Sequence, residues 1–409
     1  MSKPPASSAP WAAGTLAALT GINLFNYLDR QILPAVLVPL KAELGWSDSQ
    51  LGGAAVAFML GYFLTAPIFG YLGDRWPRKG LIVLGVAVWS LGTVLSGRAH
   101  GFGAMVCFRV LVGLGEASYG TISPAWIADL YPSPRRNTAL SVFYLAIPVG
   151  SALGYLLGGA VAARWGWRSA FLWAGAPGFL LALALAALRE PARGAPERPA
   201  GAGAAYASLG ARPDYLLTVA GYVAQTFAQG GFAFWGPTFL VRVHGMALAP
   251  ASRFFGLSLV ATGLTATLLG GFVATAWQRR HPAGYARLLA LSALASVPVA
   301  FAAFMLPDPA QARLALVAAM FLIFLPTGPI NTLILETVPA ALRATAMAGS
   351  IFAIHLFGDL WSPEIVGYLS DRFGDLQRAI LWTLPGALAV AAIFWAWLAG
   401  RQARPTPSP

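Results

Sequence analysis

Charged residues and cysteine are what this chain has least of. Only 10% of its 409 residues are charged, 57% are hydrophobic, and the mean hydropathy is +0.66. A soluble domain carries roughly a quarter charged residues, so the composition excludes a soluble globular protein and indicates a membrane protein. The single cysteine, Cys107, excludes an intrachain disulfide, and its apolar neighbours predict a buried packing thiol.

Acidic residues are scarcer than basic ones, with 15 Asp and Glu against 27 Lys and Arg and a net charge of +12. In a soluble protein this excess would suggest nucleic-acid binding. Here the basic residues lie mainly in short loops between apolar runs, which the positive-inside rule explains, and we expect no nucleic-acid partner. The sequence shows neither a nucleophile–base set nor a metal-ligand cluster, so we expect neither an enzyme nor a metal site.

Twelve apolar runs divide the chain, each long enough to cross a bilayer core of about 30 Å as a helix. The runs are 12–36, 50–73, 79–98, 102–126, 137–162, 168–188, 214–240, 253–276, 285–306, 312–335, 342–368 and 379–400. We predict an all-α membrane protein with twelve transmembrane helices in two six-helix halves, residues 12–188 and 213–400. Residues 189–212, rich in Pro, Gly, Ala and Arg, are predicted to link the halves.

The distribution of basic residues predicts the orientation. Clusters such as Arg78-Lys79 and Arg135-Arg136 follow the second and fourth runs, and further arginines follow the sixth, the eighth and the last. All of these loops lie on one side, so both termini and the linker are expected in the cytoplasm. The short loops and the Ala/Gly-rich composition are typical of a bacterial inner-membrane protein, which we expect to be a monomer.

An internal repeat supports the division into halves. Asp129, Pro132 and Arg136 match Glu336, Pro339 and Arg343, always 207 positions apart. Two six-helix halves in the same orientation are typical of a secondary transporter whose site lies between the halves at mid-depth.

Four charged residues interrupt the apolar runs. Asp29 and Arg30 lie in the first run, and Arg109 and Glu116 lie in the fourth. Charges inside a spanning helix are costly and mark functional sites. We predict that Asp29 and Glu116 carry protons, and that Arg30 and Arg109 bind an anionic substrate or switch the carboxylates. Counting 1.5 Å per residue places Asp29 and Arg109 at similar depth, which predicts an Asp29–Arg109 pair with Glu116 deeper on the same wall.

Further polar residues near these charges, or in the second half, are candidates for substrate binding. His355 and Asp359 are four apart on one helix face, and Pro326 and Pro329 predict a kink. For His355, a packing role is an equally open interpretation. The candidates are Asn26, Tyr27, Tyr119, Asn331, His355 and Asp359.

The loop after the second run resembles the signature of the major facilitator superfamily. Its residues Gly70, Asp74, Arg75 and Arg78 match the pattern, although Pro77 replaces a glycine that the family usually has. The resemblance implies a gating loop whose contacts form in one conformation and break in the other.

Glycines in the fifth run, within residues 148–159, are spaced four apart, which favours close helix packing.

Four blocks together resemble the Spinster family of this superfamily. They are residues 26–30, 112–124, 127–132 and 355–363. The resemblance implies a lipid-type transporter: animal members move sphingosine-1-phosphate or lysophospholipids, and proton coupling is ascribed to a helix-1 aspartate and a helix-4 glutamate. By motif these residues are Asp29 and Glu116 here.

Other functions share parts of this pattern. The helix-1 block also resembles the anion:cation symporters, which import sugar acids with protons, and the aromatic residues of the seventh run would suit a drug–proton antiporter. A non-transporting receptor would not need buried titratable groups. We therefore expect a transporter of an anionic amphiphile that alternates access and is driven by the proton gradient, without any other cofactor. Its expected partners are protons, membrane lipids and a lipid or small-molecule substrate.

Overall fold

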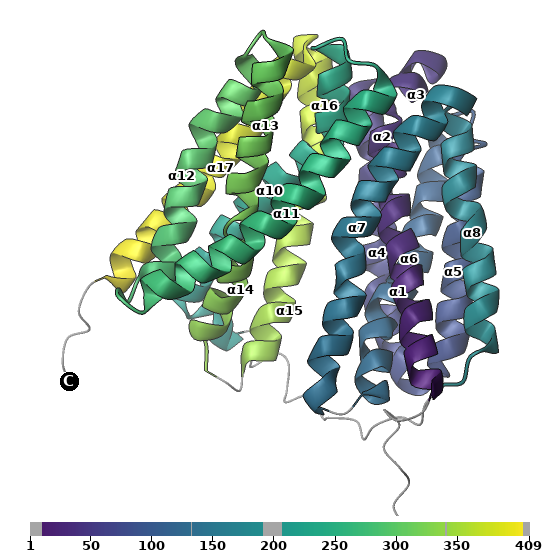
Figure 1. Cartoon of the computed structure of the whole chain (residues 1–409), viewed down its shortest axis with the longest axis horizontal. Coiled ribbons are helices and arrows are strands. Elements are labelled where there is room, and N and C mark those ends of the chain that lie inside the picture. Colours follow the sequence, from purple (N-terminus) through teal and green to yellow (C-terminus); the bar gives the residue numbers. More distant parts are fainter. Residues whose placement is uncertain (1–9, 132, 191–206, 340–341, 404–409) are drawn as a thin grey trace, which may run out of the picture. The chain divides into compact units, whose positions relative to one another are not determined.

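The computed structural model describes residues 10–131, 133–190, 207–339 and 342–403, and this part of the chain is helical and contains no strand (Figure 1). The predicted linker 189–212 lies largely outside these ranges. Two compact units can be distinguished. The first comprises residues 1–196 together with 240–257, and the second comprises 197–239 and 258–409.

The helices of the first unit begin near the N-terminus. They are α1 (Pro10–Arg30), α2 (Ile32–Ala35), α3 (Leu37–Leu44), α4 (Asp48–Arg75), α5 (Arg78–Ser96), α6 (Phe102–Leu130), α7 (Ser133–Trp165) and α8 (Trp167–Ala187). The later helices belong to the second unit, except that the end of α10 and the first part of α11 belong to the first unit. They are α10 (Pro213–Arg242), α11 (Leu248–Gln278), α12 (Gly284–Met305), α13 (Pro309–Phe324), α14 (Thr327–Glu336), α15 (Arg343–Ile354), the π-helix η3 (His355–Asp359), α16 (Ser362–Phe373) and α17 (Leu376–Gln402).

Each of the twelve predicted runs corresponds to one helix or to consecutive helices. By length and composition, nine stretches of the described chain could span a membrane. The predicted runs outside these nine are 12–36, 214–240 and 342–368, which form α1–α2, α10 and α15–α16. The first and third of these runs are interrupted at the polar residues predicted to be functional.

Prolines interrupt two of the predicted runs, 12–36 and 312–335. Helix α1 ends at Arg30, because Pro34 has no N–H to donate to the Arg30 carbonyl. The Gln31 N–H instead donates to the Leu28 carbonyl at 3.1 Å, in a tighter turn. The predicted kink at Pro326 is confirmed, because α13 ends at Phe324 and α14 begins at Thr327. Beside this second break, the Ile323 carbonyl accepts a hydrogen bond of 2.7 Å from the Gln225 side chain.

Glycines bring α7 into close contact with α1. A Cβ added at Gly150 or Gly154 would collide with the carbonyl oxygens of Leu24 or Leu28. The predicted packing role of this glycine stripe is therefore confirmed. The contact holds the last turns of α1, which carry Asp29, against a helix surface that leaves no room for side chains.

One end of the first unit is held together by ion pairs. The Asp48 carboxylate, 3% exposed, accepts from Lys41 Nζ at 2.5 Å and from Arg242 Nη1 at 2.8 Å. Glu43 accepts a hydrogen bond of 2.7 Å from the Trp167 indole and pairs with Arg168. The pKa of Glu43 is lowered, chiefly by the Trp167 hydrogen bond and further by Arg168.

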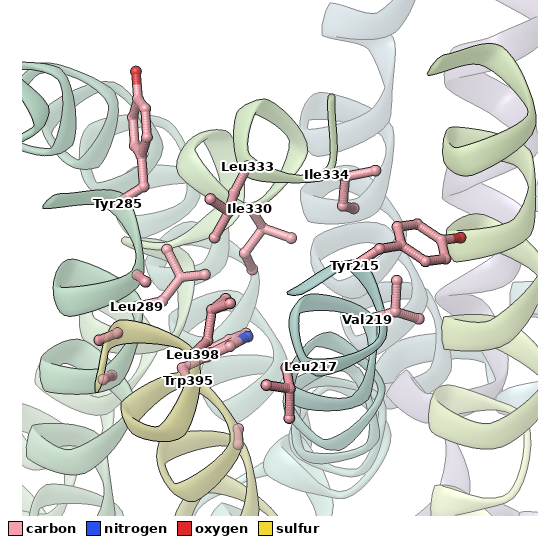
Figure 2. Packing of buried hydrophobic residues seen from close by; sticks show 14 of the residues in the cluster. Tyr215, Leu217, Val219, Tyr285, Leu289, Ile330, Leu333, Ile334, Trp395 and Leu398 are labelled. Atoms are coloured by element: carbon pink, nitrogen blue, oxygen red, sulfur yellow. The ribbon is translucent and has the colours of Figure 1, made fainter. Parts of the chain in front are cut away.

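The second unit has its own apolar core, built from α10, α12, α14 and α17. Figure 2 shows Trp395, Leu398, Leu289 and Ile330 gathered in this cluster. The Trp395 indole also donates to the Thr218 carbonyl at 3.2 Å.

Two environments differ from the expectations. Cys107 is exposed on α6 and is not a buried thiol. The aromatic side chains Phe232, Trp235 and Phe239 of α10 are 0–3% exposed, so they pack inside the protein and neither face lipid nor line an open wall. Trp235 donates its indole N–H to the Pro363 carbonyl at 3.0 Å. An apolar sequence does not reveal which side of a helix faces its neighbours.

The α1–α7 contact predicts that a glycine-to-alanine substitution changes the melting temperature differently at two glycines. Replacing glycine by alanine favours a helix by about 1 kcal/mol, but overpacking costs about 1–3 kcal/mol. We expect Gly154→Ala to lower the melting temperature of the detergent-solubilised protein. Gly21→Ala, on α1 with nothing within 4 Å of its Cβ, should not lower it. Equal effects of the two substitutions would contradict the packing assignment.

Candidate functional site

The four intramembrane charges come together inside the first unit. Asp29 and Arg30 end α1, whereas Arg109 and Glu116 lie on α6. Asp29, Arg109 and Glu116 are almost completely buried, with 1%, 2% and 0% of their surface exposed. The Arg30 side chain retains 21% exposure. Of the four, Arg30 is therefore the most exposed.

Arg30 and Glu116 form an ion pair, with Nε and Oε2 2.7 Å apart. The second carboxylate oxygen of Glu116, Oε1, is buried and has no hydrogen-bond partner among the described residues. Breaking a buried pair by removing one partner is strongly destabilising, because the other charge is left uncompensated. The charge of Glu116 is thus stabilised mainly by one guanidinium.

Asp29 is bonded differently from the predicted arrangement. Its Oδ2 accepts a hydrogen bond from the Thr93 hydroxyl of α5, and its Oδ1 is buried without a partner in the described chain. No ion pair joins Asp29 to Arg109 in this structure. The predicted pair is corrected: α1 pairs with α6 through Arg30 and Glu116.

The direction of helical side chains explains the correction. Side chains lean towards the N-terminus of their own helix. Helices α1 and α6, the first and fourth spans, run in opposite directions, so the Arg30 side chain leans towards the level of Glu116. A depth estimate from Cα positions alone misses this displacement.

Aromatic rings surround the Arg30 guanidinium. Its central carbon lies 4.7 Å from the ring centre of Tyr27 and 5.2 Å from those of Phe58 and Tyr62. The Arg109 guanidinium lies 4.9 Å from the Phe58 ring as well, so Phe58 contacts both cations. Such contacts stabilise a desolvated cation. Phe58 and Tyr62 were not predicted from the sequence; their spacing of four on α4 is the only signal there.

Arg109 makes few polar contacts. Its Nε and Nη1 are buried without hydrogen-bond partners among the described residues. The ring of Phe58 and the nearby carboxylates of Asp29 and Glu116 provide its surroundings. Arg109 can therefore compensate either carboxylate electrostatically while bonding to neither.

The other candidates in the first unit occupy different environments. Asn26 is 2% exposed, and its Nδ2 has no partner in the described chain. Tyr119 is 1% exposed, donates its hydroxyl proton to the Leu19 carbonyl at 2.5 Å and packs edge-on against Trp89. Tyr119 is therefore closed to solvent and contacts protein groups.

The candidates of the second unit make hydrogen bonds with residues on their own helix. His355 Nδ1 lies 3.0 Å from both carboxylate oxygens of Asp359, within the π-helical turn η3. Their side chains are 37% and 26% exposed. Such turns often occur at functional sites. Asn331 bonds back to the Thr327 carbonyl at 3.0 Å.

The loop between α4 and α5 is anchored at several points. Arg78 forms an ion pair with Asp129 at the end of α6, and its Nε donates to the Gly73 carbonyl at 3.4 Å. Glu190 accepts from the backbone N–H groups of Arg78 and Lys79 at 2.8 and 3.2 Å, which caps α5.

The glycine and arginine at the start of the loop signature make local contacts. Arg75 donates to the Tyr71 carbonyl at 3.3 Å. A Cβ at Gly70 would make ordinary contact with Thr121 at 3.7 Å.

Among the described residues, no group of three or more His, Cys, Asp or Glu is arranged to hold a metal ion.

Comparison with known proteins identifies the class that this fold and these charges define. The Major Facilitator Superfamily profile matches residues 19–358. The chain therefore belongs to this superfamily of membrane transporters, which confirms the predicted fold class and the expectation that it is not an enzyme.

Closer relatives define the family. Human protein spinster homolog 1 is 35% identical over 392 residues, which cover 87% of this chain and 72% of that protein. A crystal structure of a bacterial homolog to the human lysosomal transporter Spinster, inward-facing and unoccupied, superimposes with a TM-score of 0.84 at 26% identity, covering 98% of this chain and 99% of that one. The chain belongs to the Spinster family.

A more distant structure shares the fold alone. The D-xylose–proton symporter superimposes with a TM-score of 0.72 at 20% identity, covering 93% of this chain and 96% of that one.

The buried ion pair predicts a strongly non-additive mutant cycle. Arg30→Gln leaves the Glu116 charge uncompensated and should destabilise the protein by about 3 kcal/mol. The double variant Arg30→Gln/Glu116→Gln removes both charges and should recover most of that loss. Thermal unfolding of the purified variants at pH 7 measures the cycle. Additive losses in the double variant would show that the two side chains do not depend on each other.

Proposed function

We propose that the chain is a proton-coupled secondary transporter that carries an anionic amphiphile by alternating access. The observation that carries this proposal is the ion pair between an accessible arginine, Arg30, and a fully buried acid, Glu116. A substrate anion that reaches this site meets the guanidinium that stabilises the Glu116 charge.

Competition for Arg30 couples the anion to a proton. When an anion takes the guanidinium, Glu116 loses its direct counter-charge in an apolar surrounding. An isolated buried carboxylate is costly, and binding a proton neutralises it. Anion binding and proton binding therefore favour each other, which is the relation that symport requires.

Asp29 is a second proton acceptor in this scheme. Thr93 holds one of its oxygens, while Oδ1 is available for a proton. Arg109 lies near both carboxylates without bonding to either, so it can follow whichever of them is ionised.

The surroundings of Arg30 favour an amphiphile. A guanidinium recognises phosphate or carboxylate groups, and the rings of Tyr27, Phe58 and Tyr62 offer apolar surface beside it. The Spinster relationship supports a lipid substrate of the lysophospholipid or sphingoid-phosphate type. A sugar acid would instead need several hydroxyl-binding groups around the cation.

The remaining parts of the proposal follow from the loops and their contacts. The Arg78–Asp129 pair is one contact that a rocking motion could break and remake. The excess of Arg and Lys in the loops supports cytoplasmic termini, and the short loops and the Ala/Gly-rich composition support a bacterial inner membrane. Transport requires a single chain, which acts as a monomer and uses the proton gradient.

Proton coupling through Glu116 predicts that anion binding depends on pH. Binding of lysophosphatidylglycerol to the native protein should strengthen as pH falls, by up to about tenfold per pH unit, because one proton enters with each anion. Glu116→Gln, which is permanently neutral, should bind with an affinity that changes much less with pH, because only Asp29 is left to take up a proton. Titrations between pH 5 and 8 measure this.

Glu43→Gln is the matched control, because Glu43 is an acid of the first unit outside the spanning segments. This variant should keep the native pH dependence. If Glu116→Gln kept it too, Glu116 would not carry the coupled proton.

The substrate class can be tested with probes that share a charge and differ in the tail. We expect lysophosphatidylglycerol to stabilise the protein thermally more than glycerophosphoglycerol, which lacks the acyl chain. Tyr62→Leu should weaken the lysolipid more than the tail-less probe. Stabilisation by D-glucuronate, without any by the lysolipid, would instead support a sugar-acid symporter.

A further inference from the structure

A cavity of about 630 Å³ opens at the end of the second unit where α10 begins and α11, α14 and α17 end. Its size is within the range of small-molecule sites. The polar residues that line it are Arg212, Asp214, Gln278, Glu336, Thr337, Arg401 and Gln402. No part of the transport scheme uses these residues.

The internal repeat shows why this cavity is open. Glu336, at the end of α14, corresponds to Asp129 near the end of α6. In the first unit, Asp129 is ion-paired with Arg78, the first residue of α5. The corresponding helix of the second unit, α12, begins with Gly284, where even a Cβ would collide with the backbone of Gln278. The second half therefore has the acid, but its helix α12 begins with a glycine where α5 begins with an arginine.

Glu336 is consequently an acid without a direct partner in the part of the chain that the structure describes. Its side chain makes no hydrogen bond or ion pair within the described ranges. Arg343 acts on it electrostatically, but the Arg343 Nε donates to the Leu335 carbonyl at 3.2 Å. A cationic group bound in the cavity would take the position that Arg78 has beside Asp129.

One cationic side chain of the cavity, Arg212, is available to a ligand as well. Asp214 and Arg401 neutralise each other in an ion pair of 2.9 Å. Gln278 is committed on both sides, since its Oε1 accepts from the Tyr285 N–H and its Nε2 donates to the Pro282 carbonyl. Arg212, by contrast, has a buried Nε with no hydrogen-bond partner among the described residues.

The cavity thus offers one uncommitted guanidinium and one uncommitted carboxylate, with no net charge among its four charged lining residues. Leu333 lines it too, and belongs to the apolar cluster that Figure 2 shows with Tyr285 and Leu398. A ligand that fits carries an anionic group, such as a phosphate, and an ammonium group, next to a short apolar part.

We propose that this cavity binds a zwitterionic phosphate ester of the phosphoethanolamine kind, with Arg212 holding the phosphate and Glu336 the ammonium group. The ligand is either the headgroup of a membrane phospholipid or the free soluble ester. The site is distinct from Arg30 and does not depend on the proposed transport mechanism.

The test compares two short-chain lipids that differ in the amine. Dihexanoyl phosphatidylethanolamine should bind the full-length, detergent-solubilised protein about threefold to tenfold more tightly than dihexanoyl phosphatidylglycerol. Glu336→Gln should abolish this preference and leave phosphatidylglycerol binding unchanged. Arg212→Gln should weaken both lipids, whereas Arg212→Lys, which keeps the charge, should retain most of the binding.

Charge-matched controls exclude general electrostatics. Arg279→Gln and Asp371→Asn change exposed residues that do not line this cavity, and both should bind like the native protein. Each variant is first checked for native-like elution and thermal unfolding. Equal binding of the two lipids by the native protein, an unchanged preference in Glu336→Gln, or an equal loss in Arg279→Gln would overturn the proposal.

A titration with O-phosphoethanolamine distinguishes the two sources. Binding as tight as that of the short-chain lipid would assign the site to the free ester. Binding at least tenfold weaker, with the same response to Glu336→Gln, would assign it to a lipid headgroup.

Discussion

The ion pair between Arg30 and Glu116 is the interaction on which the rest of the first unit depends. It joins α1 to α6 inside an apolar bundle, where neither charge would be stable alone. Because one partner is reachable and the other is buried, a ligand that competes for the arginine changes the charge state that the acid can sustain. The same contact thus links folding stability to ligand and proton binding.

Several local features place this pair. The glycines of α7 hold the last turns of α1, and the helix ends directly after Arg30 because Pro34 interrupts its hydrogen bonds. Phe58 of α4 contacts both guanidiniums and leaves Arg109 near the carboxylates without a bond to them. Backbone packing therefore fixes the positions of the charges, and the lean of the Arg30 side chain brings its guanidinium to Glu116.

Much of this architecture is predictable from the sequence. The spans follow from hydropathy, and the importance of the four charges follows from their cost in an apolar helix. The partner of Glu116 was not predictable from depth, because the lean of the Arg30 side chain displaces its guanidinium from its Cα. Phe58 was not predicted, because one more aromatic residue in an apolar helix does not stand out and its spacing of four from Tyr62 is the only signal.

The repeat was informative in a different way. It aligns Asp129 with Glu336, yet the two acids have different surroundings, because α5 begins with an arginine and α12 with a glycine. Sequence symmetry predicted the equivalence, and only the structure shows that one acid is ion-paired while the other lines a cavity. The contact between His355 and Asp359 follows from their spacing of four, whereas the π-helical form of the turn that contains them shows only in the structure.

Proton uptake on ligand binding tests the central claim most directly. Lysophosphatidylglycerol is added to the purified protein in weakly buffered solution near neutral pH, and a pH indicator records the protons taken up. The account predicts uptake of up to about one proton per bound anion in the native protein, and a much smaller uptake in Glu116→Gln at saturating ligand. Binding without proton uptake, or equal uptake in the two proteins, would contradict it.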